Sequence, residues 1–505
     1  MTVTRFDYQG RIALPAPFVQ LEDLMQRLLI GFCALFSTLV PTLVQAATLT
    51  PPKGGQYAII VQGNGGIEFA RNADDMIAPA STMKVLTALA ARLELGADFR
   101  FATEIQAQAG AKQGNTINGD IWINFVGDPT LSRMDLVALF KQLGVTRIKG
   151  NVYVNTGAYN GYERGNGWSW GDQTLCFAAP VSAVIIDKNC AYGTITATQI
   201  GRPAVGNVAT GVPIGIGADN VEVMSYGDMA RQFCALEVDM AKGNFYELKG
   251  CITPNKEPQG LRFAIHDVEA WGWDNIRWAM NRAGISHDGL LRVTHQAPVS
   301  ADTLATHYSV SLPVMLSKML KKSDNLYADT FLKTVGRHYY NKPGSYRSGT
   351  MAVRAIPTKQ GIDLGNATLA DGSGLSAHNL ISARQMLSVL NFIQKNDAEL
   401  DFIKLLPSSQ VDGTLAWRRS VTAPMMKNKV HAKTGTITGT SNLAGFIDTA
   451  GGQRKAFVMF QRGLSQDPAT HERYRASKAA WPWTVFEKGV LESIYQQQPL
   501  QIAEQ

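Results

Sequence analysis

Three short motifs that contain Ser or Lys lie far apart in this chain of 505 residues, and their separation restricts the folds that it can adopt. They are Ser81-Thr82-Met83-Lys84, Ser323-Asp324-Asn325 and Lys433-Thr434-Gly435-Thr436. Ser323 follows Ser81 by 242 positions (323 − 81), far more than one helix-rich lobe needs. At least one additional domain must therefore lie between the first two motifs.

The first motif has the residues of an activated nucleophile. Apolar residues recur at helical spacing from Val85 to Leu93, so we expect a helix over 81–95 that stops at Gly96. A Lys three residues after a Ser lies on the same helix face, where its amine can take the hydroxyl proton of Ser81. Such a pair also arises by chance about once or twice in a chain of this length.

The other two motifs are ambiguous when taken singly. A Ser-Asp-Asn tripeptide is more often a helix cap or turn, and a Lys-Thr-Gly tripeptide is more often an exposed strand end. In this order, however, the three motifs supply what a serine hydrolase needs for a carboxylate-ended substrate. They offer a nucleophile with its base, a second hydroxyl with an amide, and a cation on a strand edge.

The rest of the sequence predicts an α/β unit that is interrupted by a β-rich insertion. Residues 100–155 alternate between apolar and polar side chains in short runs, and 161–260 stay strand-like and rich in Gly. The later helices and strands are expected at 274–283, 310–332, 383–391, 442–447, 456–461 and 481–494, with a hairpin turn at 450–453 and a frayed tail over 496–505.

An apolar run from Leu28 to Val44 indicates export. The run is short for a membrane span, Pro41 breaks it and small residues follow it, so we expect residues 1–46 to be a cleaved signal peptide. A retained anchor is the alternative. Acidic residues precede the run, whereas translation from Met25 would leave a compact basic head, so Met25 is an alternative start.

Cleavage would remove Cys33 and leave four cysteines in an exported chain. An even number in an oxidising compartment favours disulfides. Four cysteines allow three pairings, of which the short-loop one joins Cys176 to Cys190 and Cys234 to Cys251. A zinc site is the alternative, but neither C-x-x-C spacing nor a His at ligand spacing accompanies these residues.

The ordered motif set resembles that of the penicillin-binding proteins and serine β-lactamases. The similarity covers about residues 48–495, and it points to the class C low-molecular-mass penicillin-binding proteins of the penicillin-binding protein 4 type. The segments that carry it are Pro79–Lys84, Gly127-Asp128-Pro129, Lys321–Asn325, Asp371–Ser376 and Asn442–Phe446.

This resemblance implies a fold class and a domain order. A transpeptidase-like α/β (α+β) domain, of the serine β-lactamase and DD-peptidase type, would comprise 47–100 and 294–495. Two inserted β-rich domains would occupy 101–293, the inner one at about 185–260. Members of the family degrade peptidoglycan in the periplasm, as D-alanyl-D-alanine carboxypeptidases and as endopeptidases on D-alanyl-diaminopimelate cross-links, and β-lactams inhibit them covalently.

The resemblance also implies catalytic roles. Ser81 would be the acyl-enzyme nucleophile and Lys84 its base. Ser323 would shuttle a proton to the leaving amine, and Asn325 would hold the acyl amide of the substrate. Lys433 would bind the terminal carboxylate and, as a second cation, favour the neutral form of Lys84.

Further positions concern the substrate. Thr434, Gly435 and Thr436 would complete the carboxylate site, and the backbone N–H groups of Ser81 and Thr436 would form the oxyanion hole. Asp172 resembles a family position that binds the free amine of a diaminopimelate stem, with a loop cap as the alternative.

Two positions depart from the family pattern and predict weaker contacts to the carboxylate of the stem peptide. Ala377 stands where the family has Arg, and Thr438 stands where it has a long polar residue.

Two rival functions remain. A class A β-lactamase deacylates with a Glu-bearing motif downstream of Ser-Asp-Asn, and Leu326-Tyr327-Ala328-Asp329 offers no counterpart. A non-catalytic cell-wall-binding protein would be expected to lose Ser81, Lys84 or Lys433, and all three are present.

Composition and charge restrict the classes of partner that this chain can be expected to bind. The net charge of +7 is scattered without a Lys/Arg block, which argues against nucleic acid and is compatible with weak association with a membrane or the wall. We expect Trp271, Trp273 and Trp278 to pack in a core, with stacking on the cell wall as the alternative. No cofactor or metal is implied, and a homodimer is left open.

Overall fold

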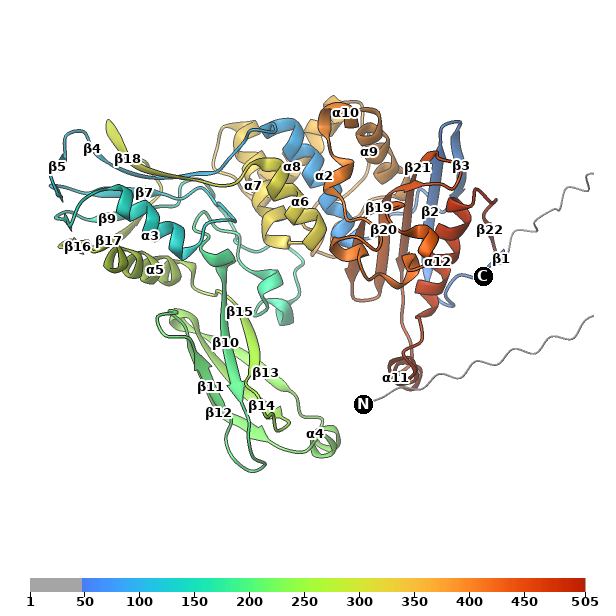
Figure 1. Cartoon of the computed structure of the whole chain (residues 1–505), viewed down its shortest axis with the longest axis horizontal. Coiled ribbons are helices and arrows are strands. Elements are labelled where there is room, and N and C mark those ends of the chain that lie inside the picture. Colours follow the sequence, from blue (N-terminus) through green and yellow to red (C-terminus); the bar gives the residue numbers. More distant parts are fainter. Residues whose placement is uncertain (1–47, 505) are drawn as a thin grey trace, which may run out of the picture. The chain divides into compact units, whose positions relative to one another are not determined.

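The computed structural model describes residues 48–504 (Figure 1). The signal peptide expected over 1–46 and the alternative start at Met25 lie outside the described residues. Among the helices of 48–504, none is both long and apolar enough to cross a membrane.

The first large sheet is antiparallel and joins the two ends of the described chain. Its strands, in spatial order, are β19 (Val430–Ile437), β20 (Thr440–Asp448), β21 (Arg454–Arg462), β2 (Gln56–Gly63) and β3 (Gly66–Arg71). Successive residues of β2 alternate between two cores, because Ala58 and Ile60 belong to one cluster and Ile59 and Val61 to another. The sheet is therefore covered on both faces, and β19 lies at its edge.

Helices form the cores on the two faces of this sheet (Figure 1). One core contains α2 (Met83–Leu95), α6 (Leu312–Lys322), α7 (Asn325–Tyr340), α8 (Tyr346–Lys359) and α9 (Ala383–Lys395), and the other contains α12 (Pro482–Tyr495). Two shorter helices are α10 (Asp397–Leu400) and α11 (Pro468–Ser477). The single helical run expected over 310–332 is wrong: Ser323 ends α6 in the left-handed conformation (φ 56°), and the Asp324 side chain accepts from Tyr327 N to begin α7.

A second sheet lies within the chain between α2 and α6. Its strands, in spatial order, are β17 (Leu291–Thr294), β9 (Val152–Asn155), β7 (Ile121–Asn124), β4 (Ala102–Gln108) and β18 (Ala301–Tyr308). It packs with α3 (Arg133–Gln142) and α5 (Val268–Ala283), and a small sheet of β16 (Ser286–His287), β8 (Arg147–Ile148), β6 (Thr116–Ile117) and β5 (Lys112–Gln113) adjoins it. Because β18 pairs with β4, this sheet extends to Tyr308 rather than to 293. We now propose a domain boundary near 308.

The innermost segment of the insertion forms two three-stranded sheets. One contains β11 (Val205–Val208), β10 (Cys190–Thr196) and β15 (Gln259–Ala264), and the other contains β12 (Gly215–Val223), β14 (Phe245–Ile252) and β13 (Leu236–Ala241), with α4 (Tyr226–Gln232) between β12 and β13. The two sheets share one apolar core around Tyr246 and Phe263.

The four cysteines of the insertion form two disulfides. Cys176 is joined to Cys190 and Cys234 to Cys251, with Cα–Cα distances of 5.3 and 5.7 Å. The short-loop pairing is therefore confirmed, and these thiols are not free to bind zinc.

The expectation of a frayed C-terminal tail is wrong for part of its length. Residues Gln501–Ile502 form β22, which pairs in parallel with β1 (Thr48–Leu49). Leu49 and Ile502 pack against the same apolar cluster as α12, which explains why the chain is held there.

Candidate active site

Ser81 lies in a 3-10 turn, Ala80–Thr82, that leads directly into α2. Buried Ala80 has a positive φ of 47°, and the Thr82 hydroxyl donates to Pro79 O over 2.7 Å. The turn is pressed against Gly374, where an added Cβ would lie 1.8 Å from Ala80 O. A strained turn that is fixed by its surroundings presents Ser81, whose side chain is half-buried.

Lys84 is fully buried beside Ser81. Its Nζ donates to Ser81 Oγ at 2.8 Å, to Asn325 Oδ1 at 2.7 Å and to Ser373 O at 2.6 Å. Burial lowers the pKa of Lys84 to about 8, although the carboxylates of Asp329, Asp371 and Asp324 act in the opposite direction. All three protons of the ammonium are used, so loss of one would turn the amine into an acceptor for the serine hydroxyl.

Ser323 and Lys433 form a second pair. Lys433 lies in the edge strand β19 and is fully buried, and its Nζ donates to Ser323 Oγ at 2.9 Å and to Thr434 O at 2.8 Å. Burial holds the pKa of Lys433 well below its usual value, and the cations Lys84 and Arg418 act in the same direction.

Two buried carboxyl groups to which the sequence analysis gave no catalytic role, Asp329 and Asp371, lie near these pairs. Asp329 Oδ1 accepts from Gly372 N at 2.7 Å and Ser373 N at 3.2 Å, which holds the carbonyl that Lys84 uses. Burial raises the pKa of Asp329 to about 8, and the neighbouring Asp371 adds to this shift. The spacing of Asn325 and Asp329, four residues apart in one helix, could have shown that both face the same site.

A cleft of about 520 Å³ opens at this site. The expected residues that line it are Ser81, Asp172, Ser323, Asn325 and Thr436, and the two departures from the family, Ala377 and Thr438, line it as well. The lining does not include Lys84, Lys433, Thr434 or Gly435 among the described residues.

The third motif thus divides between the cleft and the interior. Thr436 is exposed, whereas the Thr434 hydroxyl donates to Thr414 Oγ1 at 2.9 Å. Gly435 is needed for packing, since a Cβ there would lie 2.6 Å from Pro79 O. The strand edge therefore fits closely against the turn that carries Ser81.

The insertion supplies another wall of the cleft. Asn325 Nδ2 donates to Phe177 O at 2.9 Å, and Trp168 Nε1 donates to Asp371 Oδ2 at 2.9 Å. Lys188 forms an ion pair with Asp324 at 2.6 Å. Asp172 is half-buried in the cleft, and no hydrogen bond or ion pair to its carboxylate occurs within residues 48–504, which does not favour the loop-cap alternative.

Comparisons with known proteins agree with this arrangement. The model of the D-Ala-D-Ala carboxypeptidase 3 (S13) family matches residues 44–482. D-alanyl-D-alanine carboxypeptidase DacB of Haemophilus influenzae is 37% identical over 428 residues, which are 84% of this chain and 87% of the relative. D-alanyl-D-alanine carboxypeptidase of Actinomadura sp. is 28% identical over 418 residues, 79% and 75% of the two chains.

The fold is also shared with a solved relative. The crystal structure of penicillin-binding protein 4 from Haemophilus influenzae matches with a TM-score of 0.82 and 35% identity, covering 88% of this chain and 97% of the other. The predicted resemblance and the mixed α/β fold class are confirmed. The chain belongs to the D-Ala-D-Ala carboxypeptidase 3 (S13) family.

Proposed function

We propose that this chain is a serine-type D-Ala-D-Ala carboxypeptidase and endopeptidase that cleaves peptidoglycan peptides through an acyl-enzyme. The observation that carries the proposal is the 2.8 Å hydrogen bond between Lys84 Nζ and Ser81 Oγ at the base of an open cleft. The buried pair of Ser323 and Lys433, with Ser323 in the lining of that cleft, completes the set that a carboxylate-ended substrate requires.

Acylation begins at Ser81. Neutral Lys84 takes the hydroxyl proton while Oγ attacks the carbonyl carbon of the penultimate D-Ala. The resulting oxyanion is held by the backbone N–H groups of Ser81 and Thr436, which lie where the turn and the edge strand meet. Asn325, which lines the cleft beside Lys84, holds the amide of the acyl segment.

Collapse of the tetrahedral intermediate breaks the peptide bond. The departing D-Ala nitrogen receives a proton through Ser323, whose hydroxyl is held by Lys433. An ester on Ser81 remains, and water hydrolyses it while Lys84 again acts as base, which restores the serine and releases the shortened peptide.

The positive charge for the substrate carboxylate lies behind the cleft surface. Lys433 does not line the cleft, so it acts on the carboxylate through Ser323 and through its field, while the exposed Thr436 hydroxyl can contact the carboxylate directly. Ala377 and Thr438, which line the same cleft, offer no charged group to a carboxylate of the stem peptide.

The free carboxylate of Asp172 supports a diaminopimelate-containing substrate. An unpaired acid in the cleft can bind the free amine of such a stem, both in a carboxypeptidase substrate and in a cross-link. The expected signal peptide and the two disulfides support action in the periplasm. β-Lactams would acylate Ser81 in the same way.

Intact mass measurement after incubation with benzylpenicillin tests the proposal. We expect a single long-lived adduct on the wild type, none on Ser81→Ala, and an undiminished adduct on Ser169→Ala, which removes an exposed hydroxyl from the same cleft. Rapid loss of the adduct with turnover of the drug would show a β-lactamase. No adduct on any form would show a non-catalytic binder.

A further inference from the structure

The cleft that contains Ser81 has no cation at its surface. Among the described residues, its lining contains the acid Asp172 but no Lys or Arg, and Lys433 lies buried behind it. In both proposed reactions the leaving residue carries one carboxylate, which the Thr436 hydroxyl and the pair of Ser323 and Lys433 serve. Any further anionic group of the leaving portion must find its cation outside the cleft.

A hollow of about 340 Å³ adjoins the cleft at the end of β19 and the turn into β20. The two cavities share Thr436 and Ile437. Arg418 and Arg419 line the hollow, and its described lining contains no Asp or Glu. Pockets for small ligands span about 300–1,000 Å³, so the volume is sufficient for a ligand. We call this cavity, lined by Arg418 and Arg419 and adjoining the cleft at Thr436, the arginine hollow.

Arg418 is held firmly at the arginine hollow. Its Nε and Nη2 donate to the two carboxylate oxygens of buried Glu487 in α12, each at 2.6 Å, and Nη2 also donates to Ser441 Oγ at 3.2 Å. Ser441 is the cross-strand partner of Thr436, so the two side chains share one face of the sheet. Arg418 Nη1 has no acceptor in the described part of the chain, and 17% of the side chain is exposed. Because Glu487 neutralises its charge, Arg418 offers a hydrogen-bond donor rather than a free cation.

Arg419 supplies the uncompensated charge. It is exposed, and its Nη1 donates to two backbone carbonyls, Lys478 O at 3.0 Å and Ala479 O at 2.9 Å. Within residues 48–504 its Nε and Nη2 have no partner, and no carboxylate pairs with it. Nε and Nη2 form the edge of a guanidinium that binds a carboxylate through two parallel hydrogen bonds. Arg419 is therefore available to an anionic ligand.

The arginine hollow also has apolar walls. Ile437, Leu464 and Trp483 line it, and Trp483 stacks on Trp481 with ring centroids 5.0 Å apart and planes 3° apart. A D-Ala leaving group has one methyl group and one carboxylate, and it would not reach from Thr436 across these walls. A longer leaving portion, with methylene groups followed by a second carboxylate, suits the hollow better.

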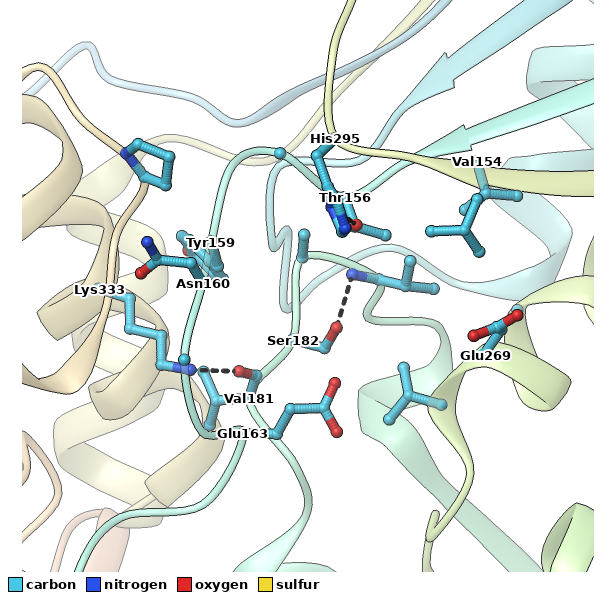
Figure 2. Close-up of a pocket in the computed structure, with 18 of the residues that line it drawn as sticks. Val154, Thr156, Tyr159, Asn160, Glu163, Val181, Ser182, Glu269, His295 and Lys333 are labelled. Atoms are coloured by element: carbon cyan, nitrogen blue, oxygen red, sulfur yellow. Dashed lines mark hydrogen bonds between the residues drawn. The ribbon is translucent and has the colours of Figure 1, made fainter.

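Figure 2 shows a larger hollow, of about 600 Å³, that is less suited to a second carboxylate. It shares none of its described lining residues with the cleft. Lys333 is the one lysine of its described lining, which contains no Arg, and its Nζ already donates to Tyr162 O at 2.8 Å and Val181 O at 2.7 Å. Glu163 and Glu269 line the same hollow. An anionic group would meet two acids and a lysine that is already used.

We propose that the arginine hollow binds the leaving portion of a cross-linked substrate, a diaminopimelate-containing peptide with a second carboxylate. Arg419 binds this carboxylate through Nε and Nη2, Arg418 Nη1 donates to the same peptide, and the apolar walls cover the methylene chain. The inference rests on the proposed function and deepens it, because the hollow distinguishes a cross-link from a D-Ala-D-Ala end. A carboxypeptidase substrate leaves the hollow empty.

Steady-state hydrolysis of three synthetic peptides tests the proposal. They share one acyl stem and differ in the leaving portion, which is D-Ala, an N-acetyl-diaminopimelyl-D-Ala peptide with its terminal carboxylate free, or the same peptide as its carboxamide. Wild type should cleave the free acid with a kcat/KM about tenfold above that of the carboxamide, as expected for a charge-assisted pair.

Variants of Arg419 locate the effect. Arg419→Gln should lower kcat/KM for the free acid about tenfold, mainly through a higher KM, and by a smaller factor, less than about twofold, for the other two peptides. Arg419→Lys should recover part of the loss. Arg347→Gln, which removes an exposed arginine outside both cavities, should change none of the three. Wild-type rates of acylation by benzylpenicillin would show that the variants are folded.

A salt series on wild type gives a second measurement that needs no variant. Arg419 is exposed, so the preference for the free acid over the carboxamide should shrink as the ionic strength rises. Equal kcat/KM for these two peptides on wild type would overturn the proposal, as would an equal loss for all three on Arg419→Gln or a preference that salt does not alter.

Failure of the proposed function would look different. None of the three peptides would be cleaved and benzylpenicillin would leave no adduct, which would overturn both proposals together. Cleavage of the D-Ala peptide by a protein that forms the adduct, without a preference for the free acid, would overturn the role of the arginine hollow alone.

Discussion

Lys84 and Asn325, which are 241 positions apart, are joined by a hydrogen bond of 2.7 Å from Nζ to Oδ1. The bond connects α2 to the first residue of α7, so the two parts of the chain that flank the insertion position the amine together. The amide nitrogen of Asn325 donates to Phe177 O of the insertion. The Asn325 side chain is thus hydrogen-bonded both to the proposed base, Lys84, and to the wall of the cleft.

Replacement of Asn325 by Asp should therefore weaken acylation. A carboxylate 2.7 Å from Nζ stabilises the ammonium and raises the pKa of Lys84. We expect the second-order rate of acylation by benzylpenicillin to fall at least tenfold at pH 7 and to recover partly at higher pH. A pH profile of the acylation rate with the same midpoint as that of the wild type would contradict this electrostatic role. The control Asn325→Ala should lower the rate without moving this midpoint upward.

The wild-type acylation rate should itself rise with pH through about 8. Lys84 is protonated below its pKa of about 8 and is a competent base only above it, so the rate follows the neutral fraction. Rates measured from pH 6 to 9 check this. Lys84→Arg keeps the charge at every pH and should lose about 10²–10⁴-fold in rate, the usual contribution of a positioned base. A flat wild-type profile would show that another group accepts the proton.

The sequence predicted the local parts of the site well. The three-residue spacing of Ser81 and Lys84 in a helix was enough to place them together, and the structure joins them at 2.8 Å. Alternation of apolar residues located β20 and β21 to within two residues. Such features depend on near neighbours in the chain, which a periodic pattern reports.

Features set by distant contacts were not predicted. The pairing of β18 with β4 and of β22 with β1 joins segments far apart in the chain. The hydrogen bond from the Thr434 hydroxyl to Thr414 Oγ1 likewise joins residues 20 positions apart, which the spacing within the motif does not reveal.

The two disulfides should differ in their effect on the cleft. Cys176 lies next to Phe177, whose carbonyl accepts from Asn325, whereas Cys234 lies between α4 and β13 and Cys251 lies in β14. Double replacement of either cysteine pair by Ala removes a short covalent loop. It should lower the free energy of unfolding by about 3 kcal/mol. Only Cys176→Ala/Cys190→Ala should also slow acylation by benzylpenicillin. Equal acylation rates in the two double variants would show that the segment around Phe177 is held without its disulfide.

Lys333→Met should change how stability depends on pH. Burial lowers the pKa of Lys333 to about 8, so the unfolded chain binds more protons between that value and the ordinary lysine value, and the folded state gains stability as pH rises through this window. From pH 8 to 9.5 the gain is about 1.5 kcal/mol. The variant lacks this pH-dependent gain. It also leaves the carbonyls of Tyr162 and Val181 without their donor, and each loss costs about 1–3 kcal/mol of unfolding free energy. Urea unfolding should therefore show the stability of wild type relative to the variant increasing toward pH 9.5. The exposed control Lys256→Met should show no such increase, and a constant difference for Lys333→Met would mean that the buried amine keeps its proton throughout this range.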